Sequence, residues 1–102
     1  MLIKKKYFLY ITSNTNDTVL YVGVTNDLSR RIMEHKTKRY DGFTARYNVN
    51  KLIYYEVFNY IDLAIKREKT LKGWTRDKKV QLINSKNIEW KELYLDGMIS
   101  TI

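Results

Sequence analysis

Polar side chains that could do chemistry interrupt the apolar stripe of one expected helix. This helix is expected from about Asp27 to Lys38, with Asn26 or Asp27 as its N-cap. At about 100° per residue, His35 shares one stripe with Leu28 and Ile32. Arg31 lies at the edge of that stripe, one turn before the histidine. His35 is either a core histidine bonded to a backbone carbonyl or a group that transfers protons. Arg31 either extends past the core to solvent or binds a phosphate through its fork of donors.

Glu68 interrupts the stripe of a second helix, which is expected to be capped by Asp62 and to end near Lys72, before Gly73. The other residues of its buried face are expected to be Ile61, Ala64, Ile65 and Leu71. An unpaired carboxylate on a packing face is costly, so Glu68 needs a cation. That cation is either an internal arginine or a divalent metal, because Mg²⁺ is often held by one carboxylate together with water and substrate phosphate.

Besides the polar residues of the two helices, two tyrosines on paired strands could take part in a site. Tyr10 and Tyr21 lie in neighbouring strand patterns, and Gly23 shares a strand face with Tyr21. A glycine inside a strand often marks a place where something approaches the backbone. For each tyrosine alone, core packing with its hydroxyl at the rim is the favoured explanation. The combination with Arg31, His35 and Glu68, all expected on one sheet face, favours a site.

The tyrosines, Arg31, His35 and Glu68 supply the groups that hydrolysis of a phosphodiester requires. A metal at Glu68 would polarise a phosphoryl oxygen and stabilise developing charge. A tyrosine with its ordinary pKa near 10 is a poor base at neutral pH, but a nearby cation lowers that pKa, and Arg31 is the expected source of the shift. The residues therefore predict a metal-assisted hydrolase that acts on phosphodiesters.

The elements that must position these residues form a single domain of 102 residues, 1–102. Turn-forming residues separate a first hairpin, and the expected order is ββαβαα. The strands are expected at Tyr7 to Thr12, Val19 to Thr25 and Lys51 to Phe58, and the third helix from a Thr75 cap through about Ile83. Tyr40 to Asn50 is expected to be a loop, and Asn84 to Ile102 receives no assignment. This α+β pattern predicts a three-stranded sheet, containing an antiparallel hairpin, with helices packed against it.

Composition excludes several other classes of protein. The 19 Lys and Arg residues exceed the 11 Asp and Glu residues by 8, which favours a polyanionic partner such as nucleic acid. The absence of cysteine excludes disulfides, cysteine-based zinc sites and thiol nucleophiles, and a single histidine excludes a histidine metal cluster. Because no apolar run approaches the roughly 20 residues of a membrane span, a soluble cytoplasmic protein without membrane contact is expected.

The same residues resemble the GIY-YIG nuclease domain, in its small stand-alone form, over about residues 5–85. The matching segments are Tyr7 to Tyr10, Leu20 to Arg31 with His35, Arg67 to Lys69, and Lys72 to Trp74. The first motif reads Phe8-Leu9-Tyr10 rather than Gly-Ile-Tyr, and Val22 replaces isoleucine in the second. Both changes preserve strand-forming character. The asparagine that many members carry after the metal-binding glutamate has two candidates, Asn84 and Asn87.

The resemblance implies an endonuclease with one Mg²⁺ or Mn²⁺ ion per site. It implies that Tyr10 helps to activate water, that Arg31 stabilises the phosphate and that Glu68 is the metal ligand. It further implies Tyr21 and His35 as catalytic residues and Gly23 as a structural part of the second motif. DNA of branched or single-stranded character, in repair or recombination, is the substrate that the resemblance implies.

Basic and aromatic residues could rim such a site. The candidates for nucleic-acid contact are Lys36, Lys38, Arg39, Arg46, Lys69, Lys72 and Arg76. Contacts of this kind position a phosphate backbone without reading sequence, and the alternative is an ordinary solvated helix face. In the segment around Gly42, an aromatic side chain from Tyr40, Phe43 or Tyr47 could stack on an unpaired base or pack on the sheet.

Three hypotheses follow from the sequence. The first is a metal-dependent DNA endonuclease. The second is a non-catalytic nucleic-acid-binding module of the same fold. The third is a catalytic subunit whose protein partner supplies substrate specificity. A carboxylate on a packing face favours catalysis over binding alone, because it repels phosphate.

Overall fold

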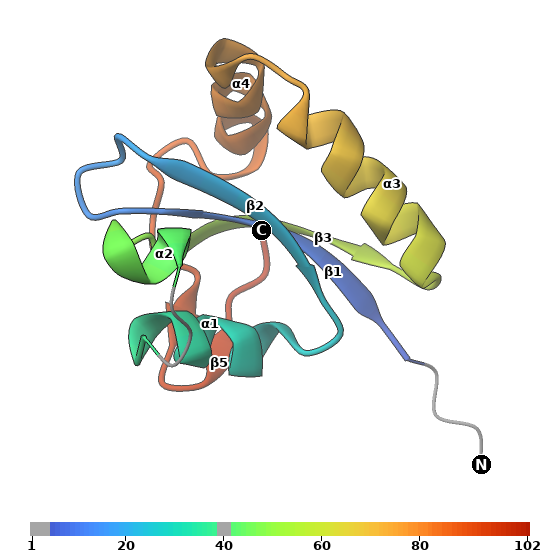
Figure 1. Ribbon diagram of the computed structural model, residues 1–102, viewed down its shortest axis with the longest axis horizontal. Helices are drawn as coiled ribbons and strands as arrows, with labels where there is room; N and C mark the ends of the chain where they lie inside the picture. Colours follow the sequence, from blue (N-terminus) through green and yellow to red (C-terminus); the bar gives the residue numbers. More distant parts are fainter. Residues whose placement is uncertain (1–4, 39–41) are drawn as a thin grey trace.

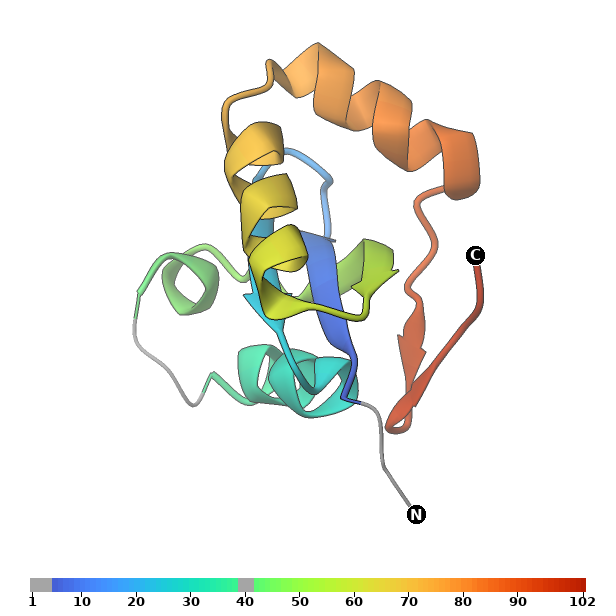
Figure 2. The ribbon, with the colours of Figure 1, turned by 90° about the vertical axis from the view of Figure 1, so that its right-hand side faces the viewer.

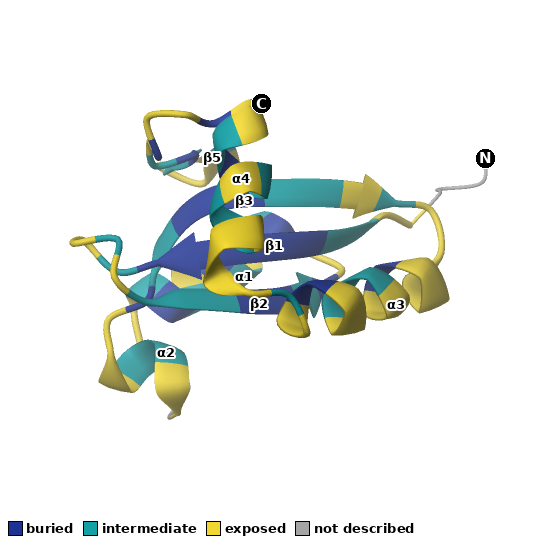
Figure 3. Cartoon of the chain, turned by 90° about the horizontal axis from the view of Figure 1, so that it is seen from above, coloured by how far each residue is buried: buried dark blue, intermediate teal, exposed yellow. Residues whose placement is uncertain are grey.

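Three antiparallel strands form the centre of the molecule in a computed structural model, which describes residues 5–38 and 42–102 (Figure 1). The strands are β1 (Tyr7–Ser13), β2 (Leu20–Thr25) and β3 (Lys51–Phe58), and their order in the sheet is β2-β1-β3. The expected hairpin is therefore confirmed, and β2 is an edge strand. Strand β1 lies between its two neighbours and is buried over much of its length (Figure 3).

Helices cover both faces of this sheet. Helix α1 (Leu28–Lys36) lies on one face, and α3 (Ile61–Lys72) and α4 (Arg76–Lys86) lie on the other (Figures 1 and 2). A short helix, α2 (Phe43–Arg46), occupies the segment that the sequence predicted to be a loop. The α+β class and the order ββαβαα are confirmed, with α2 and a C-terminal hairpin as additions.

Alternation along the strands gives the sheet two apolar cores. Leu9 and Ile11 point to the side of α3 and α4, where they pack with Leu71 and Ile83. Tyr10 points to the opposite side, in a cluster whose other buried members are Leu28, Ile32, Leu52 and Leu93. Successive side chains of a strand face opposite sides of a sheet, so the residues around Tyr10 in β1 separate naturally into these two layers.

Local signals fix two of the helix starts. The Asp27 side chain accepts a hydrogen bond of 3.1 Å from Arg30 N at the start of α1. The Thr75 hydroxyl accepts one of 3.3 Å from Lys78 N at the start of α4. Side-chain oxygens at these positions satisfy amide groups that have no partner within the helix. Both caps follow the sequence prediction.

The start of α3 differs from the prediction. Tyr60 is its N-cap residue, and Asp62 lies inside the first turn. Ile61 and Ile65 were expected to be buried but are 49% and 38% exposed. The helix meets the sheet along the stripe that contains Ala64 and Leu71, and Ile61 and Ile65 lie to the side of that stripe. Helical spacing of the apolar residues alone did not show which of them contact the sheet.

The C-terminal segment forms a small hairpin beside α1 (Figure 1). Its strands are β4 (Tyr94–Leu95) and β5 (Met98–Ile99), joined through Gly97, which has a φ of 83°. The Ser29 hydroxyl of α1 donates a 2.6 Å hydrogen bond to Gly97 O. The hairpin thus closes the core on the α1 side of the sheet. None of the helices in residues 5–38 and 42–102 has the length and apolar character to traverse a lipid bilayer.

Candidate active site

Tyr10 lies directly across Gly23, because β1 and β2 pair these two residues. A Cβ atom built on Gly23 would be 2.5 Å from the Tyr10 hydroxyl oxygen and 2.6 Å from Cζ of its ring. Glycine at position 23 therefore makes room for the Tyr10 phenol. The sequence analysis expected something to approach the backbone at this glycine, and in the structure the Tyr10 side chain does so.

Replacing Gly23 with alanine is expected to displace the Tyr10 ring. Overpacking of this kind typically costs about 1–3 kcal/mol of folding free energy, and chemical denaturation would measure the loss. Gly73→Ala is the matched control, because a Cβ there would approach Thr70 O no closer than 3.5 Å, an ordinary contact. Equal stability of the two variants would contradict the packing described here.

The Tyr10 hydroxyl contacts a histidine from α1. Its oxygen lies 3.0 Å from His35 Nε2, and both side chains are buried, with exposed fractions of 1% and 6%. The other ring nitrogen, Nδ1, is 2.9 Å from Oγ1 of Thr44 in α2. The alternative reading of His35, a core histidine bonded to a backbone carbonyl, is wrong, because both contacts are with side-chain hydroxyls. The structure thus forms a chain of three groups from β1 through α1 to α2.

Burial keeps both members of the first contact neutral. Burial, with a smaller contribution from the Tyr21 phenol, raises the pKa of Tyr10 well above its ordinary value. Burial and the Arg31 charge lower the pKa of His35. The Arg31 charge does favour the Tyr10 phenolate, but the net change in the Tyr10 pKa is upward. At Tyr10, the lowering of the pKa that was expected from Arg31 is therefore outweighed by desolvation.

Tyr21 lies at the β2 edge among several rings. Its ring centroid is 6.2 Å from that of Tyr10 and 5.9 Å from that of His35. Phe43 of α2 stacks against it at 6.3 Å and 26°. Lys72 Nζ lies over the same ring, 5.9 Å from its centroid. Tyr21 therefore joins the buried pair to the surface of the molecule.

Arg31 lies on α1, one turn before His35. Its Nε atom is 3.8 Å from a carboxylate oxygen of Glu34, and its side chain is 33% exposed. Its positive charge acts on both the Tyr10 phenol and the His35 imidazole. Arg31 is thus close to both groups and partly open to solvent.

Glu68 reaches the site from the other side of the sheet. Its side chain is 22% exposed, and one of its carboxylate oxygens is 3.5 Å from Lys72 Nζ. Its negative charge raises the pKa of Tyr10 across the edge of the sheet. The expectation that all of these residues face one side of the sheet is wrong, because α1 and α3 cover opposite faces (Figure 1). Since β2 is an edge strand, side chains from both layers can meet around it.

The residue set suits a metal ion that keeps most of its water. Among residues 5–38 and 42–102, no group of three or more His, Cys, Asp or Glu side chains could hold a metal ion together. Glu68 is paired with Lys72 of the same helix, whose side chain is 52% exposed. One carboxylate of this kind fits Mg²⁺, which is often bound through one or two carboxylates and substrate phosphate. It does not fit a fully protein-ligated ion such as structural zinc.

Two of the residues expected to contact nucleic acid are held within the fold. Lys36 donates a 2.9 Å hydrogen bond to Asn50 O and forms an ion pair with Glu92 of the C-terminal segment. Arg76 donates hydrogen bonds of 2.7 and 3.1 Å to the carbonyls of Asp17 and Thr18 in the β1–β2 loop. Both side chains tie distant segments together, and their contact with nucleic acid stays a prediction.

The remaining basic candidates stay at the surface. Lys38, Arg46, Lys69 and Lys72 are exposed. Arg39 lies outside the described residues, as does Tyr40. Arg46 lies in α2, and Lys69 and Lys72 lie in α3. Contact of the four exposed residues with nucleic acid stays a prediction.

Neither asparagine considered as a site residue lies free. Asn84 Oδ1 accepts a 2.7 Å hydrogen bond from Trp90 Nε1. Asn87 is buried, and its amide group donates to Ile53 O at 2.9 Å and to Lys91 O at 3.0 Å. Both side chains anchor the segment that follows α4 to the rest of the fold.

The sequence analysis missed Thr44 and did not place Lys72 beside Tyr21. Thr44 follows His35 by nine residues in a segment without apolar periodicity, so spacing gave no signal for it. Lys72 follows Glu68 by one helical turn, which does predict a neighbour of that carboxylate. The contact with the Tyr21 ring depends on how α3 lies on the sheet.

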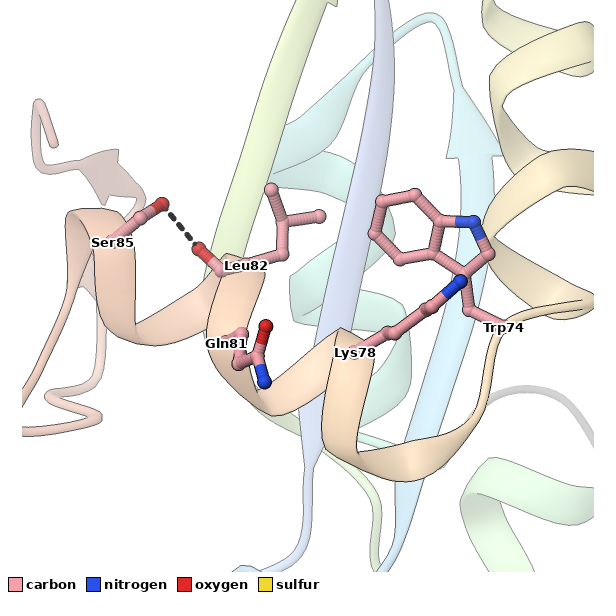
Figure 4. A pocket seen from close by; sticks show the side chains of 5 residues that line it. All are labelled: Trp74, Lys78, Gln81, Leu82 and Ser85. Atoms are coloured by element: carbon pink, nitrogen blue, oxygen red, sulfur yellow. Dashed lines mark hydrogen bonds between the residues drawn. The ribbon is translucent and has the colours of Figure 1, made fainter.

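A separate hollow lies along α4 (Figure 4). It has a volume of about 400 Å³ and is lined by Trp74, Lys78, Gln81, Leu82 and Ser85. The Ser85 hydroxyl donates to Leu82 O at 2.6 Å, so it is already used within the helix. Lys78 is the one ionisable side chain of this lining, and the groups suited to acid–base chemistry lie elsewhere, at the β2 edge.

Comparison with known proteins shows that most of the chain matches one type of domain. Residues 6–81 match the GIY-YIG catalytic domain. The chain is 38% identical to the UPF0213 protein of Clostridium perfringens over 82 aligned residues. These residues make up 80% of this chain and 87% of that protein. It is 34% identical over 76 residues to a UPF0213 protein of Haloquadratum walsbyi, covering 74% and 84%.

A solved structure shows the same fold. The solution NMR structure of a UPF0213 protein from Bacillus halodurans superposes on this chain with a TM-score of 0.55 and 25% sequence identity. The match covers 85% of this chain and 92% of that one. The segment that matches the domain, residues 6–81, includes Tyr10, Tyr21, Gly23, Arg31, His35 and Glu68.

Proposed function

Because this chain belongs to the GIY-YIG catalytic domain family, we propose that it is a divalent-metal-dependent endonuclease that hydrolyses DNA phosphodiester bonds. The observation that carries the proposal is the contact between the Tyr10 hydroxyl and His35 Nε2, 3.0 Å, at the sheet edge where Arg31 and Glu68 act on the same phenol. An acid–base pair, a guanidinium and a carboxylate in one place are the groups that this reaction needs.

Tyr10 and His35 can activate water without forming a free phenolate. As the phenol oxygen accepts a proton from the attacking water, the phenol O–H bond breaks and its proton moves to His35 Nε2. The water oxygen then bonds to phosphorus, and the bond from phosphorus to the leaving oxygen breaks. The imidazolium that results returns its proton to solvent or to the leaving group. This route agrees with a Tyr10 pKa that burial raises, because the imidazole is the base that ends with the proton.

Arg31 and Glu68 complete the site. The Arg31 guanidinium would bind the non-bridging phosphate oxygens, where its fork of donors matches their geometry. Glu68 would hold the ion once Lys72 moves into solvent. A bound Mg²⁺ or Mn²⁺ supplies charge that polarises a phosphoryl oxygen and stabilises the transition state.

The exposed surface beside the site suits DNA with unpaired bases, such as branched or single-stranded DNA. Phe43 and Tyr47 are 47% and 46% exposed, and their ring centroids are 4.9 Å apart. Phe43 also stacks on Tyr21, so aromatic surface extends from solvent to the buried pair. Bases stack on such rings, and the cations Arg46 and Lys72 lie over two of these rings, where a phosphate backbone could pass.

Replacing Phe43 with alanine is expected to weaken binding of single-stranded DNA. Stacking of one base on an aromatic side chain contributes about 1–3 kcal/mol, so the dissociation constant should rise about 5- to 150-fold, with a smaller change for duplex DNA. Fluorescence anisotropy with labelled oligonucleotides measures both. Tyr60→Ala is the control, because that ring is 66% exposed on the α3 side of the molecule. If Phe43→Ala and Tyr60→Ala weakened binding of single-stranded DNA equally, stacking of a base on Phe43 would be contradicted.

A plasmid-nicking assay tests the proposed function. Supercoiled and branched DNA are expected to be cut in Mg²⁺ or Mn²⁺ and left intact after EDTA. Binding that falls with salt but is not followed by cleavage under any metal condition would instead favour a non-catalytic nucleic-acid-binding module. Cleavage that requires a second protein would favour a catalytic subunit whose partner supplies specificity.

A further inference from the structure

His35 uses both nitrogens of its ring in contacts with hydroxyl groups. Nε2 is 3.0 Å from the Tyr10 hydroxyl oxygen, and Nδ1 is 2.9 Å from Oγ1 of Thr44. A neutral imidazole carries one proton, so it donates in one of these contacts and accepts in the other. The tautomer of His35 therefore decides whether Tyr10 gives or receives the proton that they share.

The chemistry of the two hydroxyl groups favours one of these tautomers. A phenol is a stronger hydrogen-bond donor than an aliphatic alcohol, and it is a weaker acceptor because its oxygen lone pair is delocalised into the ring. The complementary arrangement has Tyr10 donating to Nε2 and Nδ1 donating to Thr44. It leaves the phenol oxygen with a lone pair that His35 does not use.

We propose that Thr44 is a positioning residue whose Oγ1 accepts a hydrogen bond from Nδ1–H of His35. This bond holds the ring in the tautomer whose Nε2 is free to take a proton from Tyr10. The use of this tautomer in cleavage rests on the proposed endonuclease function, whereas the tautomer itself is a property of the folded protein. With the opposite tautomer, Nε2 would carry the proton, and the imidazole could not accept one from Tyr10.

Contacts on both sides hold Thr44 in place. Its own carbonyl accepts a 2.8 Å hydrogen bond from the amide of Val49, which is fully buried. Its neighbour Phe43 stacks on Tyr21. Helix α2 is therefore attached to the rest of the site by adjacent residues, which gives the one-turn helix a defined place against His35.

Long-range ¹H–¹⁵N NMR of the imidazole ring tests the tautomer directly. His35 is the only histidine of the chain, so the spectrum contains one ring. The wild-type protein at neutral pH is expected to show the proton on Nδ1. Thr44→Val removes the acceptor at almost unchanged volume and is expected to move the proton to Nε2, whereas Thr44→Ser is expected to keep it on Nδ1. Thr70→Val, at an exposed threonine of α3, should leave the spectrum unchanged.

Cleavage kinetics give the second readout. Thr44→Val should lower kcat about 10²-fold, the lower end of what general-base assistance contributes, with KM unchanged, and Thr44→Ser should restore kcat to within a few-fold of wild type. A variant that is only less stable, measured below its unfolding temperature, should keep the wild-type ring tautomer. It should also not lose kcat selectively with KM unchanged.

Several outcomes would overturn the assignment of Thr44. A wild-type ring protonated on Nε2 would do so by itself, whether or not the valine variant folds. So would a folded Thr44→Val protein that keeps the proton on Nδ1, or one that changes tautomer and cleaves as fast as wild type. If the wild-type protein cuts no DNA but its tautomer follows residue 44, the endonuclease proposal fails and the positioning of the ring by Thr44 stands.

Discussion

Glu68→Gln is expected to reduce DNA cleavage by at least about 10³-fold, because an amide holds Mg²⁺ far more weakly than a carboxylate does. A metal ion contributes several kcal/mol to the transition state of phosphoryl transfer, and each 1.4 kcal/mol corresponds to about a factor of ten in rate. Glu68 is the only carboxylate shown to act on the Tyr10 phenol from α3. Single-turnover cleavage of a labelled substrate over a range of Mg²⁺ concentrations measures the effect.

The control for this variant is Glu89→Gln. Glu89 is 69% exposed and pairs with Lys91, near the C-terminal segment, so its replacement should leave the rate unchanged. DNA binding by Glu68→Gln in low salt is expected to persist or to tighten, since a negative charge has been removed from a basic surface. Cleavage by Glu68→Gln at the wild-type rate would show that the assigned site is wrong.

Tyr10→Phe is expected to lower kcat about 10²- to 10⁴-fold and to leave a measurable remainder, because general-base assistance typically contributes that much. The phenyl ring keeps the packing over Gly23 but removes the oxygen that lies 3.0 Å from His35 Nε2. Tyr54→Phe is the matched control. Tyr54 is also a buried tyrosine, but its hydroxyl donates to Glu56 on β3, away from His35. If kcat of Tyr10→Phe were within a few-fold of wild type, like that of Tyr54→Phe, Tyr10 would not be part of the proton path.

The pH dependence of kcat/KM gives the same site a second test. His35 must be neutral to take a proton from Tyr10, and burial together with the Arg31 charge lowers the pKa of His35. Activity should therefore be retained as the pH falls through the ordinary histidine value of about 6.5, and be lost only at more acidic pH, where the imidazole is protonated. An acid limb centred above 6.5 would contradict the proton path. At high pH, the raised pKa of Tyr10 should keep its phenol protonated beyond the range of ordinary tyrosines.

Those parts of the fold that depend on neighbouring residues could be predicted from the sequence. Alternation defined β1 and β2, and the turn-forming residues between them defined a hairpin. Asp27 and Thr75 marked the starts of α1 and α4 because a capping side chain acts within its own helix turn. The third strand, Lys51–Phe58, has the bounds that its residue types predicted.

The parts that depend on distant segments could not be predicted in this way. Strand order made β2 an edge, and only that order lets Glu68 approach the Tyr10 phenol from the opposite face of the sheet. Lys36 looked like a solvated basic residue because its partner, Glu92, lies 56 positions away. Periodicity placed Tyr10 and His35 in the interior, but their contact with each other depends on how α1 packs against the sheet.

Binding of Mn²⁺ at Glu68 is the most direct test of the central claim, that a carboxylate from α3 holds a divalent ion beside the Tyr10–His35 pair. Crystals soaked in Mn²⁺ and measured at a wavelength where manganese scatters anomalously locate the ion independently of any cleavage. One anomalous peak next to the Glu68 carboxylate, lost in crystals of Glu68→Gln, is the result expected. Well-diffracting crystals at saturating Mn²⁺ with no peak at Glu68, or with a peak that persists in the glutamine variant, would contradict it.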